Sequence, residues 1–334
     1  MAQDIRVISE IELRAALGLD VAIVDCIESA IATLATAAVV MPPVLSMHFA
    51  EVNGEVDIKT AYVPGLPSFA VKISSGFFDN GTLGLASLSG MMALFSSRTG
   101  YVEAILLDNG FLTDLRTAAA GAVAARHLSR DNSSRVAILG TGLQARMQLE
   151  ALRLVRPIDH AIIWGRSFDK AFSLANEMRE KTGINIEAKA NARDAVTGAD
   201  IVVTTTPAQS PILFADWLEA GQHVTAMGSD AAIKNELDPQ CLARADLYVA
   251  DRLSQVEKIG ELRRALATGT IREAAGIPEL GQIIAGQMQG RRSERDITIC
   301  DLTGMGIQDT AIAILARDRL ERTQRNRSSK NKLS

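Results

Sequence analysis

Residues 135–145 read RVAILGTGLQA, which is a short apolar run, a glycine turn and the start of a helical sequence. A strand that leads through a glycine turn into a helix makes an anion site, because the first N–H groups of a helix have no partner within it. Gly140 permits the tight turn, Gly142 lets a pyrophosphate approach the backbone, and Ala145 lets helix and strand pack closely. Glycine turns also occur for purely structural reasons, but here both the strand and the helix are present. The motif predicts a nucleotide site made by Gly140, Thr141, Gly142, Leu143, Gln144 and Ala145.

Apolar runs and helical segments alternate from this motif onward. Helices are expected over residues 143–155, 168–181 and 191–198. Runs typical of strands occupy residues 135–140, 160–165, 184–190, 200–206, 223–228, 245–251 and 296–302. Such alternation predicts an α/β fold with a Rossmann-type doubly wound parallel sheet.

Residues 44–110 have a different character. Short β-rich runs are separated there by Asn-Gly, Pro-Gly or Thr-Gly turns, which predicts an antiparallel or mixed sheet. Ahead of this segment, Ser9 and Glu12 fit a capping box that opens a helix, and Asp20 can cap a second helix.

Three further segments complete this outline. Residues 113–128 are rich in small residues and predict a helix suited to close packing. Residues 309–324 have the pattern of an amphipathic helix, and the polar, basic residues 325–334 are expected to form a frayed tail.

Composition narrows the class of protein. The chain has 334 residues, enough for two domains, with 47% hydrophobic and 22% charged residues. A net charge of −4 gives no electrostatic reason to expect nucleic acid or an anionic membrane as a partner. The 3 cysteines and 4 histidines show no disulfide framework and no metal-ligand spacing, so no metal is expected. Without a signal-like start or a membrane-length apolar run, a cytoplasmic protein is expected.

Several segments together resemble the ornithine cyclodeaminase/μ-crystallin family. They extend in the same order over nearly the whole chain, and the resemblance is closest to the branch encoded with ectoine-utilisation genes. The segments are SFAVKIS around Lys72, LLDNGFLTDLRTAAAGAVAARHL, GTGLQA, TTTP at 204–207, AMGSDAAIKNELDP at 226–239 and DLTGMGIQDTAIA at 301–313.

The resemblance implies a fold in which a Rossmann domain is inserted into an α+β domain. Residues 1–116 plus 310–334 would form the substrate-binding and dimerisation domain, and residues 117–309 the NAD(P)-binding domain. Members are typically homodimers that use NAD(H) or NADP(H) to oxidise or reduce a C–N bond next to a carboxylate.

Asp230 follows a strand end, at the sheet edge where open α/β folds bind ligands. By resemblance it occupies the position of the catalytic aspartate, a general acid/base near the substrate nitrogen. A carboxylate suits that role if burial raises its pKa toward neutrality. The alternative is an aspartate that only caps the next helix.

Lys72 and Arg116 are the expected substrate-binding cations. Lys72 lies within an apolar strand, where it must face solvent or have a buried partner, and the resemblance favours contact with the substrate carboxylate, with a part in catalysis. Arg116 can bind a carboxylate with two parallel hydrogen bonds. The resemblance implies that Arg116 and Thr117 bridge substrate and cofactor, although Arg116 could instead form an interdomain salt bridge.

The loop after the expected strand at residues 160–165 indicates which nicotinamide cofactor is bound. NAD-preferring sites carry an acidic residue here, whereas Arg166 and Ser167 suit the 2′-phosphate of NADP(H), so NADP(H) is expected over NAD(H). Gly304 is expected at the substrate as well as over the nicotinamide. By resemblance the remaining cofactor contacts are Ser87, Thr205, Met227, Gly228, Lys234 and Thr303.

The sequence departs from the family pattern at one position that concerns the substrate. In the segment that corresponds to residues 41–49, family members that act on ornithine have an arginine just after a proline, and this arginine contacts the substrate carboxylate. Here Pro43 is followed by Val44, and no arginine occurs nearby. Lys59 or His48 could compensate, or each could face water, so strict ornithine cyclodeaminase activity is not expected.

The leading hypothesis is an NAD(P)-dependent, redox-neutral cyclodeaminase acting on a small diamino acid, with ectoine catabolism as a setting. The first alternative is net reduction of an imino or keto acid at the expense of NAD(P)H. The second is a non-catalytic protein that binds a nucleotide and a small ligand, as μ-crystallin does. Retention of Lys72, Arg116 and Asp230 favours an enzyme.

Overall fold

The computed structural model describes residues 5–330. The chain forms two compact units. The mixed-sheet unit consists of residues up to 19, residues 36–116 and residues from 305 onward. The parallel-sheet unit consists of residues 20–35 and 117–304.

The mixed-sheet unit is built on six strands in the order β1-β6-β5-β4-β3-β2. Strands β2 to β6 pair antiparallel, as the turn-rich sequence predicts, and β1 pairs parallel with β6. The strands are β1 (Arg6–Ser9), β2 (Leu45–Phe49), β3 (Gly54–Ala61), β4 (Ser68–Phe77), β5 (Leu88–Ser96) and β6 (Val102–Leu107).

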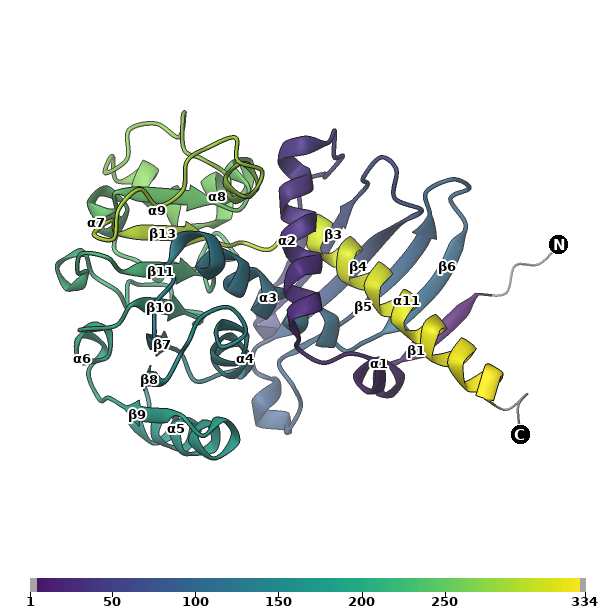
Figure 1. Cartoon of the computed structure of the whole chain (residues 1–334), viewed down its shortest axis with the longest axis horizontal. Coiled ribbons are helices and arrows are strands. Elements are labelled where there is room, and N and C mark those ends of the chain that lie inside the picture. Colours follow the sequence, from purple (N-terminus) through teal and green to yellow (C-terminus); the bar gives the residue numbers. More distant parts are fainter. Residues whose placement is uncertain (1–4, 331–334) are drawn as a thin grey trace. The chain divides into compact units, whose positions relative to one another are not determined.

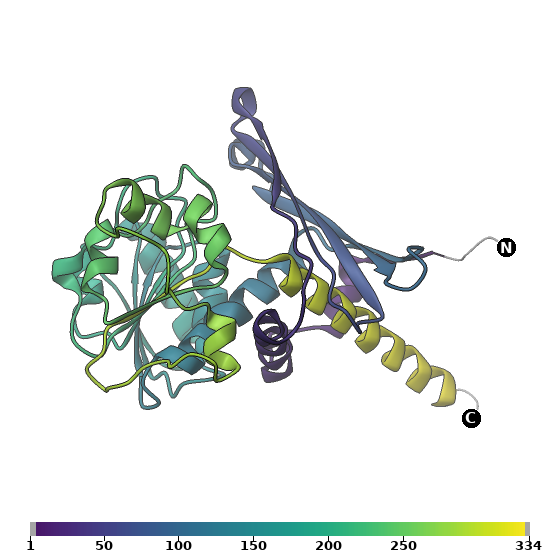
Figure 2. The same ribbon diagram turned by 90° about the horizontal axis from the view of Figure 1, so that it is seen from above.

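Helix α11 (Gly306–Lys330) packs on one face of this sheet, against β3, β4 and β5 (Figures 1 and 2). Its first residue must be glycine, because a Cβ on Gly306 would lie 2.4 Å from the carbonyl oxygen of Thr60. The buried face is apolar at Ala70 and Met92, yet it also buries Lys72. Helix α1 (Glu10–Ala16) contacts α11 and begins with the expected capping box of Ser9 and Glu12.

The parallel-sheet unit has seven strands in the order β12-β13-β11-β10-β7-β8-β9, and all neighbours pair parallel. This is the expected doubly wound sheet. Because β7 lies between β8 and β10, the chain changes direction across the sheet at β7, which is where open α/β folds bind ligands. The strands are β7 (Arg135–Leu139), β8 (His160–Trp164), β9 (Asn185–Ala188), β10 (Ile201–Thr204), β11 (His223–Ala226), β12 (Leu247–Ala250) and β13 (Thr298–Asp301).

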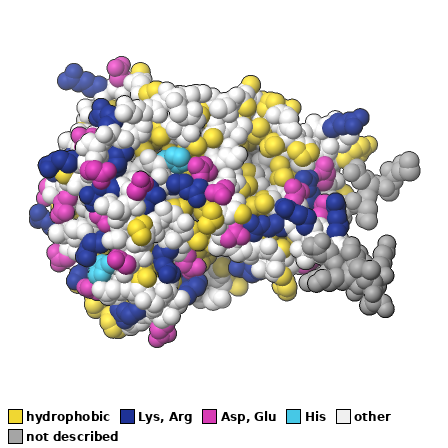
Figure 3. Space-filling model, in the orientation of Figure 1, with side chains coloured by type: hydrophobic (Ala, Val, Ile, Leu, Met, Phe, Trp, Pro, Cys, Tyr) yellow, Lys and Arg dark blue, Asp and Glu magenta, His cyan; other side chains and the backbone are white. Residues whose placement is uncertain are grey.

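Two apolar clusters form the core of this unit, and its helices supply much of them. Charged side chains of both signs are interspersed on the face of the unit seen in Figure 3. The remaining helices are α2 (Val21–Thr36), α3 (Phe111–Leu128), α4 (Leu143–Leu152), α5 (Phe168–Thr182), α6 (Ala192–Val196), α7 (Pro239–Arg244), α8 (Leu253–Ile259), α9 (Glu261–Ala267) and α10 (Leu280–Ile284), with 3₁₀ turns η1 (Ala50–Val52), η2 (Asn80–Leu83) and η3 (Ala215–Trp217).

The compact units differ from the expected domains at two places. Residues 20–35 belong to the parallel-sheet unit, because α2 is bound to α3 through Glu28, whose carboxylate pairs with Arg126 and lies 2.6 Å from Nε2 of His127. Residues 305–309 belong to the mixed-sheet unit, because α11 begins at Gly306.

Two helix ends also differ from expectation. Helix α4 stops at Leu152 rather than at residue 155, because the chain tightens into a turn closed by the Leu154 N–H on the Ala151 carbonyl. The expected frayed tail is helical as far as Lys330, the end of α11, and residues 331–334 lie outside the described residues. Within the described part of the chain, no helix combines the length and apolar character needed to cross a membrane.

Candidate functional site

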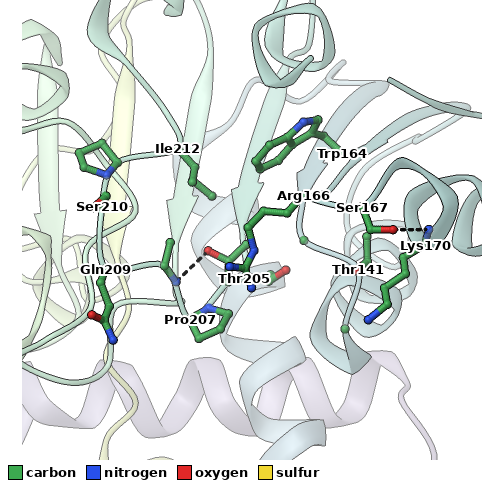
Figure 4. Close-up of a pocket in the computed structure, with 16 residues that line it drawn as sticks. Thr141, Trp164, Arg166, Ser167, Lys170, Thr205, Pro207, Gln209, Ser210 and Ile212 are labelled. Atoms are coloured by element: carbon green, nitrogen blue, oxygen red, sulfur yellow. Dashed lines mark hydrogen bonds between the residues drawn. The ribbon is translucent and has the colours of Figure 1, made fainter. Parts of the chain in front are cut away.

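A pocket of about 880 Å³ opens at the carboxyl ends of β7, β8 and β10 (Figure 4). We call it the switch-point pocket. Its size is in the range of small-molecule and cofactor sites. It is lined by Gly140, Thr141, Gly142, Trp164, Gly165, Arg166, Ser167, Lys170, Thr205, Thr206, Pro207, Ala208, Gln209, Ser210, Pro211 and Ile212.

The glycine turn forms one wall of the pocket. Gly140 has a φ of 147°, which favours glycine, and a Cβ there would lie 2.2 Å from Oγ1 of Thr205. Gly142 is the N-cap of α4 and makes no side-chain cap, so the first N–H groups of the helix face the turn. Ala145 is buried between helix and strand. This geometry suits a phosphate group at the turn.

Two cationic side chains reach the pocket from the segment after β8. Arg166 and Ser167, both predicted cofactor residues, line it, and Lys170 joins them from the first turn of α5. The hydroxyl of Ser167 accepts a hydrogen bond from the Lys170 N–H at 3.4 Å and caps that helix. None of the described residues that line the pocket is acidic. The segment is therefore suited to an anionic group.

A buried carboxylate, missed by sequence reasoning, holds the loops that follow β10 and β11. Oε1 of Glu236 accepts hydrogen bonds from the Thr206 N–H at 2.5 Å and from its hydroxyl at 2.7 Å. Oε2 accepts from the Thr204 hydroxyl at 2.6 Å and from the Gly228 N–H at 2.7 Å. Burial raises the pKa of Glu236 to about 7, although these hydrogen bonds act in the opposite direction. Glu236 thus joins a pocket-lining loop to the predicted cofactor residue Gly228.

Asp230 and Lys234 lie in the loop after β11, outside the lining of the switch-point pocket. Nζ of Lys234 lies 2.5 Å from Oδ1 of Asp230, whose side chain is 49% exposed. No helix starts directly after Asp230, and the next helix, α7, is capped by Asp238. The structure therefore does not support the helix-cap alternative for Asp230.

The loop after β13 carries Thr303 and Gly304 and is held by Asp251. The Asp251 carboxylate accepts hydrogen bonds from the Thr303 N–H at 2.7 Å and the Gly304 N–H at 3.0 Å. Burial raises the pKa of Asp251. Met227 is buried, whereas Leu143 is exposed, and neither lines the switch-point pocket.

In the mixed-sheet unit, two of the predicted cations bind one carboxylate. Nζ of Lys72 lies 3.0 Å from Oδ2 of Asp309, and Nε of Arg116 lies 3.0 Å from Oδ1. Nη1 of Arg116 donates to Oε1 of Gln308 at 3.4 Å. Nη2 of Arg116 makes no hydrogen bond among the described residues, so that edge of the guanidinium is available to a ligand. Sequence reasoning did not single out Asp309, although an aspartate within an apolar helix signals a buried partner.

The electrostatics of this group follow from burial and mutual charge. Burial lowers the pKa of Lys72 to about 7; Asp309 opposes that shift, while Arg116 and Lys59 reinforce it. Burial opposes ionisation of Asp309, but the positive charges of Lys72 and Arg116 outweigh it and lower the pKa of that carboxyl. The buried Asp108 is near enough for Lys72 to affect it, and burial raises its pKa to about 6.

The two proposed replacements for the missing arginine differ in position. Lys59 is 7% exposed and lies directly across the β3–β4 ladder from Lys72. His48 lies on β2, all of whose residues are exposed. Ser87 is half-buried in the segment before β5, and its carbonyl accepts the Phe77 N–H. Of the two, Lys59 is the one beside the Lys72–Asp309–Arg116 group.

The parallel sheet and its pocket define a Rossmann-type α/β protein, here joined to a mixed-sheet unit. The profile of the ornithine cyclodeaminase/mu-crystallin family matches residues 1–324. The chain belongs to that family.

The names of proteins similar to this chain give several different activities. A putative dehydrogenase of Rhizobium meliloti is 58% identical over 93% of this chain and 94% of its own. An uncharacterized cyclodeaminase of Sinorhizobium fredii is 57% identical over 95% of this chain and 96% of its own. Among solved structures, the Δ1-pyrroline-2-carboxylate reductase of Thermococcus litoralis, in complex with NADH and L-proline, superposes with a TM-score of 0.90 at 28% identity, covering 96% of this chain and 98% of that one.

Proposed function

We propose that this protein is an NAD(P)H-dependent enzyme that reduces the C=N bond of a small 2-imino acid. The observation that carries the proposal is the Asp309-bound pair of Lys72 and Arg116, because it offers a fixed ammonium and an open guanidinium edge to a carboxylate. The switch-point pocket supports a dinucleotide in the other unit. The similarity to a reductase bound to NADH and L-proline supports the same chemistry.

The residues have distinct roles in this proposal. Bound NAD(P)H supplies the hydride that reduces the imine carbon. Lys72 and Arg116 bind the carboxylate and fix the orientation of that carbon. Such positioning can lower the activation barrier by on the order of 7 kcal/mol or more. Asp230 is assigned, from its place in the family resemblance, to proton transfer to the nitrogen, so the C=N bond takes up one hydride and one proton.

The cofactor we propose is NADP(H) rather than NAD(H). Arg166 and Lys170 both line the switch-point pocket at the end of β8, where an NAD-preferring site carries an acidic residue. The N-terminus of α5, capped by Ser167, adds a favourable partial charge for a 2′-phosphate.

We also propose a homodimer formed through the sheet face opposite α11. On this face the rings of Phe69 and Phe95 stack at 5.3 Å, and Val7, Ile73 and Leu107 are exposed. A contiguous apolar surface of this kind is costly in water and typical of an interface. Sedimentation of the purified protein tests this proposal, since a monomer at all concentrations would contradict it.

Redox-neutral cyclodeamination is the second candidate, favoured by the 57% identical relative named a cyclodeaminase. The two reactions differ in their use of the cofactor. We expect nicotinamide absorbance to fall in proportion to the amino acid formed when NADPH is mixed with a cyclic or acyclic 2-imino acid. Formation of a cyclic amino acid from a diamino acid with no net change in that absorbance would favour cyclodeamination instead.

A further inference from the structure

We propose that Asp108 binds the nitrogen of the substrate, and that it thereby makes the enzyme select a C=N bond over a C=O bond next to the carboxylate. The inference rests on the proposed function, because it assumes that Lys72 and Arg116 bind that carboxylate. It adds a residue of the mixed-sheet unit that recognises the nitrogen, for which the proposed function names only the proton transfer by Asp230.

Asp108 lies on the same face of the sheet as Lys72. Lys72 on β4 is opposite Met92 on β5, and Met92 is opposite Leu106 on β6, so these three side chains share one face. Side chains alternate along a strand, which places Asp108, two residues after Leu106, on that face as well. Leu107 between them is exposed, whereas Leu106 and Asp108 are 0% and 1% exposed. The carboxyl group of Asp108 is therefore buried on the face that carries Lys72.

One oxygen of Asp108 fixes the start of the helix that carries Arg116. Oδ2 accepts a hydrogen bond from the Leu112 N–H at 2.9 Å, and the Asp108 carbonyl accepts one from the Phe111 N–H at 2.9 Å. Arg116 follows Leu112 by about one turn on α3. These bonds hold the Asp108 carboxyl group in a fixed place relative to the first turn of α3 and the Arg116 backbone.

The other oxygen of Asp108 has no role within the protein. Oδ1 is buried and makes no hydrogen bond with any residue in the described range 5–330. A buried carboxyl oxygen without a donor is costly, so its presence points to a ligand. Burial raises the pKa of Asp108 to about 6, while the charge of Lys72 acts in the opposite direction. Near pH 7, Oδ1 is therefore an anionic acceptor within electrostatic reach of Lys72.

Such an acceptor distinguishes nitrogen from oxygen. In a 2-imino acid the nitrogen is bonded to the carbon that carries the carboxylate, so an acceptor for its N–H must lie near the cations that bind the carboxylate. The protonated C=N group is positive, and a hydrogen bond to Oδ1 of Asp108 would stabilise it as it accepts the hydride. A keto oxygen has lone pairs and no hydrogen, and the carboxylate would repel it.

The first test compares substrates that differ only in this atom. Pyruvate with ammonium supplies a 2-imino acid, whereas pyruvate with sodium at the same ionic strength remains a keto acid, and NADPH consumption measures turnover of each. We expect the wild type to reduce the imino acid much faster. Asp108→Asn keeps an oxygen for the Leu112 N–H and presents an amide NH₂ in place of Oδ1. It should lower the rate with ammonium at least about tenfold, while the rate with sodium should not fall.

A matched variant controls for the loss of a carboxylate at a helix start. Asp238 also accepts a backbone N–H there, that of Gln240 at 2.8 Å, and caps α7. Asp238→Asn should leave both rates unchanged. Equal losses of the two rates in Asp108→Asn, or no loss of either, would overturn the inference, because Asp108 would then not distinguish nitrogen from oxygen.

A binding measurement tests the same inference without turnover. L-Proline and tetrahydrofuran-2-carboxylate have the same ring and carboxylate, but an ether oxygen replaces the nitrogen in the second. With NADP⁺ present, L-proline should raise the melting temperature of the wild type more, and Asp108→Asn should abolish that difference. Equal protection of the wild type by both acids would overturn the inference. No consumption of NADPH with any imino acid would count against the proposed function, while the comparison of the two acids would still decide the role of Asp108.

Discussion

The carboxylate of Asp309 on α11 lies 3.0 Å from Nζ of Lys72 on β4, and both side chains are buried. The same carboxylate binds Nε of Arg116 at 3.0 Å. One residue from the C-terminal helix therefore fixes two cations that are far away in the sequence. In the proposed function, Asp309 positions Lys72 and Arg116 and does not itself contact the substrate.

Asp309→Asn should destabilise the protein and weaken substrate binding. Removing one partner of a buried ion pair leaves uncompensated charge and costs about 3–5 kcal/mol of unfolding free energy. Urea unfolding measures the loss. Asp318→Asn is a matched control on the same helix, because its pair with Arg317 is partly exposed and worth at most about 1 kcal/mol. Equal stability of the two variants would show that Asp309 does not hold the cations as described.

The pKa of Lys72, about 7, predicts a pH dependence of substrate binding. Binding of a carboxylate needs the ammonium form, so the KM for the imino acid should rise as the pH increases above about 7. Lys72→Arg should give a flatter profile, since the guanidinium stays charged. An unchanged KM between pH values below and above 7 would argue against Lys72 as a carboxylate ligand.

The lowered pKa of Lys72 also affects stability, with the opposite sign from that of a lysine whose pKa is raised by its partner, because burial of Lys72 outweighs its ion pair with Asp309. The pKa of Lys72 is lower in the folded state than its usual value of 10.5, so the unfolded chain binds more protons between these values. The contribution of Lys72 to the free energy of unfolding should therefore increase as the pH rises from about 7 toward 10.5. Lys72→Met should lack this contribution in urea unfolding measured across that range.

Arg166 and Lys170 should determine the preference between the two nicotinamide cofactors. Replacing either with alanine removes a charge-assisted contact to a 2′-phosphate, worth about 1.5–3 kcal/mol, and should lower kcat/KM for NADPH roughly tenfold to a hundredfold. The value for NADH should change little. Arg193→Ala, at an exposed position on α6, serves as the control. Equal losses of kcat/KM with NADPH and NADH would mean that these residues do not bind the 2′-phosphate.

Glu236→Gln should destabilise the parallel-sheet unit although the two side chains have the same shape. Each carboxylate oxygen accepts two hydrogen bonds, so an amide NH₂ would face donors and leave at least one of them unsatisfied. The expected cost is about 1–3 kcal/mol of unfolding free energy, measured with urea. The KM for the cofactor should also rise, because Thr206 lines the pocket. A variant as stable as the wild type would show that Glu236 does not hold the loops after β10 and β11 as described.

Local sequence signals predicted much of the fold. The capping box at Ser9 and the glycine turn at Gly140 depend on neighbours in the chain, and both occur where expected. The assignment of α2 to the parallel-sheet unit was not predictable, because it depends on ion pairs between Glu28 and a distant helix.

Some residues of the candidate site can likewise be recognised from neighbours in the chain, and others only from the tertiary fold. The pocket-lining Arg166 was singled out in the sequence from its place after a strand, whereas the pocket-lining Lys170 was not, because a lysine in a first helical turn has no distinctive pattern. Asp309 and Glu236 were missed because their partners, Lys72 and Thr204 among them, are brought close only by the tertiary fold. Their burial, rather than their spacing, reveals their roles.

The most direct test of the central claim is to follow the hydride itself. NADPH deuterated at C4 of the nicotinamide is incubated with the enzyme and an imino acid, and the amino acid product is analysed by mass spectrometry. We expect one deuterium on the carbon next to the carboxylate, with equivalent loss of NADPH, and a much slower transfer in the Asp230→Asn variant, which should still bind the cofactor. Product without deuterium, formed with no loss of NADPH, would contradict it.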